Sequence, residues 1–140
     1  MIIMPVMIVW TAWGNTALER NTYTICSPEL PGAFDGYRIA QVSDLHNAEF
    51  GDGNQRLLEI LREAEPDMIA MTGDLIDSRR TDLAVALAFA EKAAQIAPCY
   101  YVSGNHEARV SEYQDLKTGL EAAGVTVLDD AQVKIEVSGE

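Results

Sequence analysis

The sequence predicts an α/β fold in which helices are layered on a parallel β-sheet. Short apolar runs of strand composition alternate with amphipathic runs of helical period, and polar side chains suited to metal binding follow directly after three of the strand-like runs. The 140 residues are about one domain in length, and 48% of them are hydrophobic, which is enough for a buried core. A disordered or fibrous chain is therefore excluded.

The predicted elements follow one another in a regular order. An early strand is expected at residues 22–26, before a turn rich in Pro and Gly, and a half-exposed strand at 131–137, where apolar and polar residues alternate. Between them the pattern predicts strands at 38–43, 67–72, 99–103 and 125–128, and helices at 54–65, 81–96 and 111–123. Because helices separate these strands, the connections should be right-handed crossovers and the strands should pair in parallel.

The first 18 residues contain no charged side chain. As a helix they would measure roughly 27 Å, close to the ~30 Å of a bilayer's hydrocarbon core, and Trp10 and Trp13 would suit its interface. We therefore predict a membrane anchor at residues 1–18, a linker and first strand at 19–36, and the main domain at 37–140. A buried segment of the domain and a cleaved signal are the alternatives. Too few basic residues flank the run to predict the side of the membrane.

The chain is strongly acidic, with 22 Asp and Glu against 10 Lys and Arg and a net charge of −12. Nucleic-acid phosphates and anionic headgroups bind to clustered Lys and Arg, so we expect no nucleic-acid partner and favour cations as ligands. Cys26 and Cys99 are isolated in the sequence, which argues against a zinc knuckle and against a dense disulfide framework.

Three of the predicted strands run directly into polar clusters. These clusters contain Asp44 and His46, then Asp74 and Asp77, and then Asn105 and His106. In a parallel α/β sheet, ligands gather beyond the carboxyl ends of the strands, so the three clusters should meet at one edge. If the first strand stays extended through Asp44 and His46, both side chains point to one face and could hold the same cation.

Each cluster also has a simpler interpretation. Asp44 and Asp74 could cap helices or turns, Asn105 after Gly104 could form a turn, and Glu107 is expected to be solvated. The functional interpretation is favoured because three strand ends carry metal-type residues and both histidines of the chain are among them. Carboxylate, imidazole and amide ligands together suit Mn, Fe or Zn. A divalent cation would also relieve the repulsion among the carboxylates.

The order of the motifs resembles the calcineurin-like metallophosphoesterase superfamily. The motifs are Asp44-x-His46, then Gly73-Asp74-x-x-Asp77, and then Gly104-Asn105-His106-Glu107. The segment at 34–80, together with the anchor-like start, is similar to the small bacterial membrane-associated phosphohydrolases of the superfamily. The resemblance implies the N-terminal half of a four-layer α/β-β/α sandwich, a partial metallophosphoesterase domain at 37–140, and a membrane-associated protein.

The resemblance also implies a centre of two divalent metal ions, Mn, Fe or Zn. Asp44 and His46 would hold the first ion, Asp74 would bridge both, and Asn105 would bind the second. His106 would lie beside the phosphoryl group as a proton donor or charge stabiliser, and Asp77 would orient its ring. The reaction would be hydrolysis of a phosphate monoester or diester, carried by a small molecule or a lipid.

Some relatives hold the substrate phosphate with an Arg directly after the second Asp of the Gly-Asp-x-x-Asp motif. In this sequence Ser78 stands at that place, followed by Arg79 and Arg80. Either Arg could contact the substrate. The simpler interpretation, a solvated pair at the start of the next helix, is slightly favoured.

The family pattern continues with a further His and a Gly-His-x-His motif, and this sequence has neither. Four candidate ligands cannot fill two metal shells that usually need about four to six donors each. We therefore expect an N-terminal half of a longer enzyme, with weak metal binding, little turnover, and an exposed apolar sheet face where a second sheet would pack. A nuclease-type diesterase is disfavoured because there is no basic stripe. A non-catalytic interaction module that keeps the fold is the alternative from another class.

Overall fold

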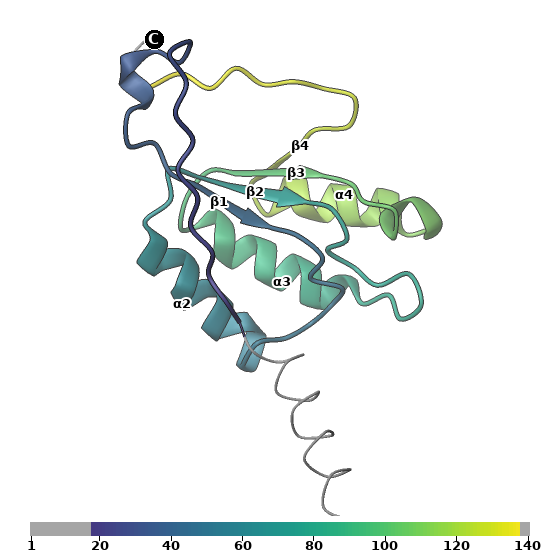
Figure 1. Cartoon of the computed structure of the whole chain (residues 1–140). Helices are drawn as coiled ribbons and strands as arrows, with labels where there is room; N and C mark the ends of the chain where they lie inside the picture. Colours follow the sequence, from purple (N-terminus) through teal and green to yellow (C-terminus); the bar gives the residue numbers. More distant parts are fainter. Residues whose placement is uncertain (1–17, 138–140) are drawn as a thin grey trace, which may run out of the picture.

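A computed structural model describes residues 18–137 and contains a four-stranded parallel sheet with three α-helices (Figure 1). The strands are β1 (Ile39–Val42), β2 (Met68–Thr72), β3 (Cys99–Val102) and β4 (Val125–Val127). The helices are α2 (Gln55–Ala64), α3 (Leu83–Ala94) and α4 (Tyr113–Ala122), with short 3-10 turns at η1 (Gly32–Phe34), η2 (Asp52–Asn54) and η3 (Glu107–Arg109). The predicted α/β class and the parallel pairing of the strands are confirmed.

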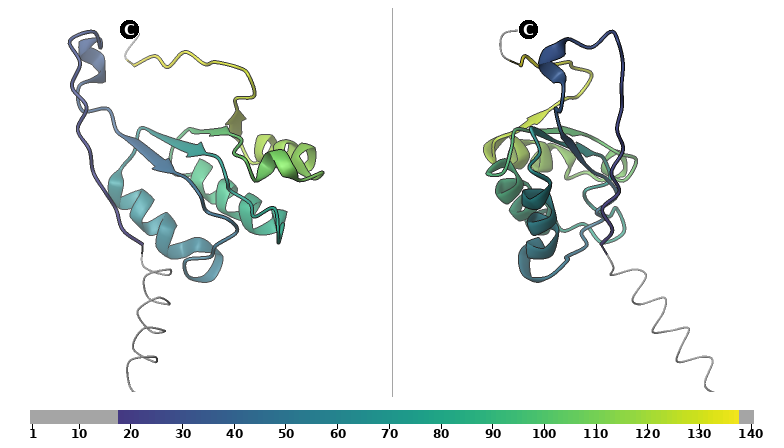
Figure 2. Two further views of the ribbon diagram at one scale, coloured as in Figure 1. Left: turned by 45° about the vertical axis from the view of Figure 1, so that its right-hand side comes forward. Right: turned by 60° about the vertical axis from the view of Figure 1, so that its left-hand side comes forward.

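The strands lie in the sheet in the same order as in the sequence, β1-β2-β3-β4. One α-helix joins each consecutive pair of strands. Because crossovers of the same hand between neighbouring parallel strands all pass over the same face of a sheet, the three helices are expected on one face. Figure 2 shows this arrangement: in its right-hand view the helices lie on one side of the sheet and the extended chain around residues 18–30 lies on the other. All four strands therefore end at one edge of the sheet.

The hydrophobic core lies between the sheet and the helices. Ile69 and Met71 of β2 point toward the helices and are fully buried, together with Tyr101 of β3. The helices contribute a matching apolar stripe, which consists of Leu58, Leu61, Ala86, Phe89, Ala90, Ala93, Leu116 and Leu120. Burial of each large apolar side chain contributes about 1.5 to 3 kcal/mol, so this layer holds the strand ends in place.

Helix α3 begins at a well-formed cap. The side chain of Asp82 accepts hydrogen bonds from the backbone N–H groups of Ala84 (3.1 Å) and Val85 (3.4 Å). The sequence pattern predicts the start of this helix at residue 81, so the boundary is correct to within two residues. Asp44 and Asp74, for which a capping role was the alternative, cap none of the described helices.

The opposite face of the sheet is open within the described residues. It carries Ile39, Tyr100 and Val102, but also Gln41, whose amide donates to the Thr72 hydroxyl over 2.8 Å. The expected exposure of this face is confirmed, whereas its expected apolar character is only partly correct, because polar side chains interrupt the apolar ones.

Two predicted strands are wrong. Residues 22–26 form no strand, and Tyr23 and Ile25 are 83% and 85% exposed. Residues 131–137 also form no strand; they leave β4 and turn back toward η1 (Figure 2), and residues 134–137 line a shallow hollow that Tyr100 of β3 also lines. Both segments have strand composition, but a strand needs a partner that accepts its backbone hydrogen bonds, and no described strand pairs with either segment.

The predicted membrane anchor at residues 1–18 lies, except for its last residue, outside the described residues. Within residues 18–137, no helix combines the length and the apolar character that a membrane span requires.

Candidate metal centre

The loops that follow β1, β2 and β3 bring three side chains together. His46, Asp74 and His106 each place one possible ligand atom within 4.8 Å of the ligand atoms of the other two. Asp74 is buried and the two histidines are half-buried. The three residues come from three separate strand ends, so the predicted convergence at the carboxyl edge of the sheet is confirmed for them.

The loop after β1 is held by backbone hydrogen bonds to the loop after β2. The N–H groups of Asp44, His46 and Asn47 donate to the carbonyl groups of Gly73 (3.2 Å), Asp74 (2.9 Å) and Leu75 (3.1 Å). These bonds continue the β1–β2 pairing beyond the end of the regular strands. The position of His46 therefore depends directly on the position of the β2 loop.

The backbone of these loops is left-handed, contrary to the extended strand that the spacing of Asp44 and His46 had suggested. The φ angles are 56° at Asp44, 48° at His46, 58° at Asn47 and 51° at Asp74. Asp, Asn and His tolerate this region better than most residues, but each such position still costs of order 1 kcal/mol. Asp44 and His46 nevertheless lie side by side, with 3.6 Å between Asp44 Oδ1 and His46 Nε2.

The imidazole of His106 is oriented by a backbone donor. The N–H of Ser78 donates to His106 Nδ1 over 3.0 Å, whereas Asp77 Oδ1 lies 3.4 Å from the same nitrogen. Because a backbone N–H can only donate, Nδ1 must accept, and the neutral ring then carries its proton on Nε2. The rings of His106 and His46 meet edge to face, with 4.4 Å between their centroids.

Asp77 lies beside His106 as a carboxylate. The backbone N–H of Arg79 donates to Asp77 Oδ1 over 2.9 Å, which lowers the pKa of the Asp77 carboxyl below its ordinary value of 3.8, and the imidazoles of His106 and His46 act in the same direction. Asp77 therefore adds negative charge at neutral pH. Arg79 and Arg80 are both exposed.

The other two predicted ligands, Asp44 and Asn105, are exposed. Asp44 is exposed and accepts a 2.5 Å hydrogen bond from the Ser43 hydroxyl at its second oxygen. Asn105 is exposed, and its side chain makes no hydrogen bond to residues 18–137. The group of three gathered side chains, His46, Asp74 and His106, thus includes the histidine predicted as catalytic rather than as a ligand.

Two further residues build the site and were not foreseen. Glu107, expected to be solvated, is 0% exposed. Asn47 donates from its amide to the Asp82 carbonyl (2.6 Å) and accepts from the Asp77 N–H (2.8 Å), which links the β1 loop to the segment before α3. Asn47 follows the Asp-x-His motif, and nothing in the sequence around it indicates its role. The only indication for Glu107 in the sequence is its position directly after His106.

The donor set fits a divalent cation. His46 Nδ1 is buried and has no hydrogen-bond partner among the described residues, which leaves a lone pair or a proton without a partner in the protein. Imidazole and carboxylate donors together suit Mn, Fe or Zn. The described residues of the site therefore have the chemistry of a metal-binding centre.

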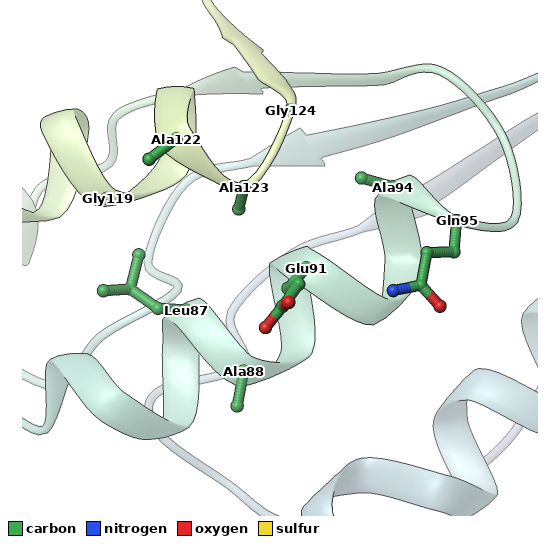
Figure 3. A pocket seen from close by; sticks show the side chains of 9 residues that line it. All are labelled: Leu87, Ala88, Glu91, Ala94, Gln95, Gly119, Ala122, Ala123 and Gly124. Carbon is green, nitrogen blue, oxygen red and sulfur yellow. The ribbon is translucent and has the colours of Figure 1, made fainter.

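A separate hollow lies on the helical side of the molecule. A groove of about 640 Å³ runs between α3 and α4 (Figure 3). Its walls are mostly small residues, including Ala88, Ala94, Gly119 and Ala122, and Glu91 is the charged residue in it. The groove shares no residue with the metal-ligand cluster and is therefore separate from the candidate metal centre.

Sequence comparisons agree with the geometry. The family described as calcineurin-like phosphoesterase matches residues 37–134. A Bacillus subtilis protein named uncharacterized metallophosphoesterase YkoQ is 30% identical over 98% of this chain and 53% of its own length. A Danio rerio protein named transmembrane protein with metallophosphoesterase domain is 29% identical over 76% of this chain and 25% of its own length. No solved structure gives a significant match.

The chain spans about half the length of the Bacillus relative and a quarter of the Danio rerio relative. The family match extends from just before β1 to beyond β4 and includes all three loops of the metal-ligand cluster. The chain therefore belongs to the calcineurin-like phosphoesterase family.

Proposed function

We propose that this protein hydrolyses phosphate esters with the help of divalent metal ions held at the carboxyl edge of its sheet. The observation that carries the proposal is the convergence of His46, Asp74 and His106, from three separate loops, to within 4.8 Å of one another. Family membership supports the same reaction class. The alternative, a non-catalytic interaction module, does not explain why these three side chains lie together.

We propose a dinuclear centre in which Asp74 is the shared ligand. Asp74 is buried, its side chain accepts the His106 N–H over 2.8 Å, and its backbone carbonyl accepts the His46 N–H over 2.9 Å. It thus contacts the loops of both histidines, which suits a shared ligand. Asp44 and His46 would hold one ion, and Asn105, with an exposed amide free of hydrogen bonds to residues 18–137, would turn to the other. When bound, such ions neutralise phosphoryl oxygens and lower the pKa of water.

His106 is proposed as a catalytic residue that touches the substrate. With Nδ1 accepting from Ser78, the neutral ring presents an Nε2–H group, which can donate to a phosphoryl or leaving oxygen. The same proton makes Nε2 a poor metal ligand. Asp77, a carboxylate whose Oδ1 lies 3.4 Å from Nδ1, would help to orient the ring.

The substrate is proposed to be a phosphorylated small molecule or lipid, and not a nucleic acid. The net charge of −12 opposes binding of polyanions, whereas a single phosphate can be neutralised by the metal ions. Membrane association through residues 1–18 is proposed from their lack of charge and from relatives named as transmembrane proteins.

Metal binding is the direct test. The protein should bind Mn²⁺ in a calorimetric titration, and Asp74→Asn should weaken this binding more than about tenfold. Asn keeps an acceptor oxygen for the His106 N–H, which Asp74 Oδ1 binds over 2.8 Å, so the loop should stay folded. Asp115→Asn on the exposed side of α4 is the matched control.

Hydrolysis of bis-p-nitrophenyl phosphate with Mn²⁺ is the second measurement. Because the four candidate ligands leave coordination positions to water, the 140-residue chain by itself should bind metal weakly and turn over slowly. Asp74→Asn should abolish whatever turnover is present. Identical metal content and activity in wild type and Asp74→Asn would reject the enzyme and favour the non-catalytic module.

A further inference from the structure

Glu107 is a buried carboxylate that takes no part in the proposed reaction. It is fully buried at the start of η3, and its neighbour in the sequence, His106, faces the metal-ligand cluster. An ionised side chain is rarely buried unless it is fully hydrogen-bonded, because transfer from water costs several kcal/mol. The partners of Glu107 therefore show what it does.

Four backbone N–H groups donate to the two oxygens of Glu107. Oε1 accepts from Leu75 (2.7 Å) and Ile76 (3.2 Å), and Oε2 accepts from Asp74 (2.9 Å) and Gly104 (2.8 Å). Three of these donors are consecutive residues of the β2 loop. The left-handed backbone at Gly73 (φ 86°) and Asp74 (φ 51°) turns them inward, as in the backbone concavities that bind anions.

The link between the two loops is reciprocal. While the Glu107 side chain holds the backbone of Asp74, the Asp74 side chain accepts the backbone N–H of His106 over 2.8 Å. The loops also approach too closely for larger residues: a Cβ on Gly73 would lie 2.8 Å from Gly104 Cα. Two members of the cluster, Asp74 and His106, are thus fixed relative to each other.

The third member is fixed indirectly. The β2 loop that Glu107 organises offers the carbonyl groups of Asp74 and Leu75 to the backbone N–H groups of His46 and Asn47. Glu107 contacts neither His46 nor Asn47 through these bonds, yet both depend on the loop that it holds.

We propose that Glu107 is the positioning residue of the metal centre: its buried carboxylate fills an anion-binding concavity of the β2 loop and thereby sets the places of Asp74, His106 and His46. For the link to the metal, this inference rests on the proposed function. The ordering of the loops by Glu107 does not.

The test uses Glu107→Gln, which keeps the size of the side chain but replaces one acceptor oxygen by an NH₂ group that faces N–H donors. Loss of the bonds at that oxygen should make amide hydrogen exchange about tenfold or more faster at His46 and Asn47, which Glu107 does not touch, with exchange of the sheet amides of Met71 and Tyr101 less affected. The Mn²⁺ affinity should fall about 10- to 100-fold.

Two controls separate positioning from general stability. Glu63→Gln, on the exposed side of α2, should change neither exchange nor affinity. Leu116→Ala removes a buried side chain of α4 and should destabilise the fold without selective loss of protection at His46 and Asn47. If Glu107→Gln does not fold, Glu107→Asp keeps both oxygens but withdraws them by one methylene, and the same comparison applies.

Unchanged protection at His46 and Asn47 in the Glu107 variant would overturn the inference, whatever the metal affinity. Selective loss of protection supports it. If the wild-type protein binds no Mn²⁺ but the Glu107 variant still loses protection selectively at His46 and Asn47, the ordering role of Glu107 is supported and the proposed metal-dependent function is rejected. Failure of the inference and failure of the proposed function therefore give different results.

Discussion

The backbone N–H of Ser78 donates to Nδ1 of His106 over 3.0 Å, so a residue that follows the Gly-Asp-x-x-Asp motif determines which nitrogen of the histidine carries the proton. The expected partner, Asp77, lies farther from Nδ1, at 3.4 Å. The side chain of Ser78 adds its hydroxyl at 3.3 Å from the same nitrogen. His106 is therefore held mainly through a backbone group, which no substitution of the Ser78 side chain except proline removes.

This contact predicts the tautomer of His106. At a pH where the ring is neutral, the proton should be on Nε2, and ¹⁵N chemical shifts of the imidazole should identify Nδ1 as the unprotonated nitrogen. His46 serves as the internal comparison, because its Nδ1 has no hydrogen-bond partner among the described residues. A neutral ring with its proton on Nδ1 would contradict the arrangement and would return Asp77 to the orienting role.

Gly104 predicts a second effect. A Cβ at this position would lie 2.5 Å from the backbone nitrogen of Asp74 and 2.8 Å from its Cγ, and a backbone atom cannot move aside cheaply. Gly104→Ala should therefore push the β2 and β3 loops apart, destabilise the protein by about 1 to 3 kcal/mol in urea unfolding, and weaken Mn²⁺ binding. Gly32→Ala is the matched control, since a Cβ there meets nothing within 4 Å. Equal behaviour of the two variants would refute the close approach.

A third prediction concerns the attachment of α4 to the segment after β4. The Tyr113 hydroxyl (2.5 Å) and the Lys117 ammonium (3.0 Å) donate to the two oxygens of Asp129, and in that order they lower the pKa of the Asp129 carboxyl below its ordinary value of 3.8. Because the folded state then binds the proton less readily than the unfolded state, this stabilisation is present above about pH 4 and is lost as the pH falls through the lowered pKa.

Tyr113→Phe removes the larger of these two causes. The variant should be less stable than wild type near neutral pH, and the difference should shrink as the pH falls below about 4, as measured by urea unfolding at a series of pH values. Tyr23→Phe, at an exposed tyrosine, is the control. A difference between Tyr113→Phe and wild type that is the same at all acidic pH values would show that the hydroxyl does not act through Asp129.

The sequence pattern predicted the sheet well because strands and helices have different hydrophobic periods, and because a helix between two strands indicates a crossover connection with parallel pairing. All four core strands and all three helices were predicted to within a few residues. The segment at 22–26 failed because composition says nothing about whether a partner strand is present. Strand pairing is a property of the whole fold and not of the segment.

The sequence predicted which side chains lie near one another, because this follows from their positions at the ends of parallel strands. It did not predict the backbone conformation of the loops that carry them. The rule that ligands gather at the carboxyl ends of parallel strands correctly predicted that His46, Asp74 and His106 lie close together. The spacing of Asp44 and His46 suggested an extended strand, but the loop is left-handed at both residues. The role of Glu107 could not be foreseen, because its partners are backbone N–H groups of a loop about 30 residues away.

The last prediction separates the two roles open to His106, since it lies both in the metal-ligand cluster and beside the proposed position of the phosphate. As a hydrogen-bond donor to the substrate, His106 should be dispensable for metal binding, and His106→Ala should lower turnover of bis-p-nitrophenyl phosphate by about 10²- to 10³-fold while the Mn²⁺ affinity stays at the wild-type value. His46→Ala, at a proposed ligand, should instead weaken Mn²⁺ binding directly. If calorimetry shows that both alanine variants lose Mn²⁺ affinity equally, then His106 is a metal ligand, and the proton on Nε2 inferred from the Ser78 contact is absent in the metal-bound protein.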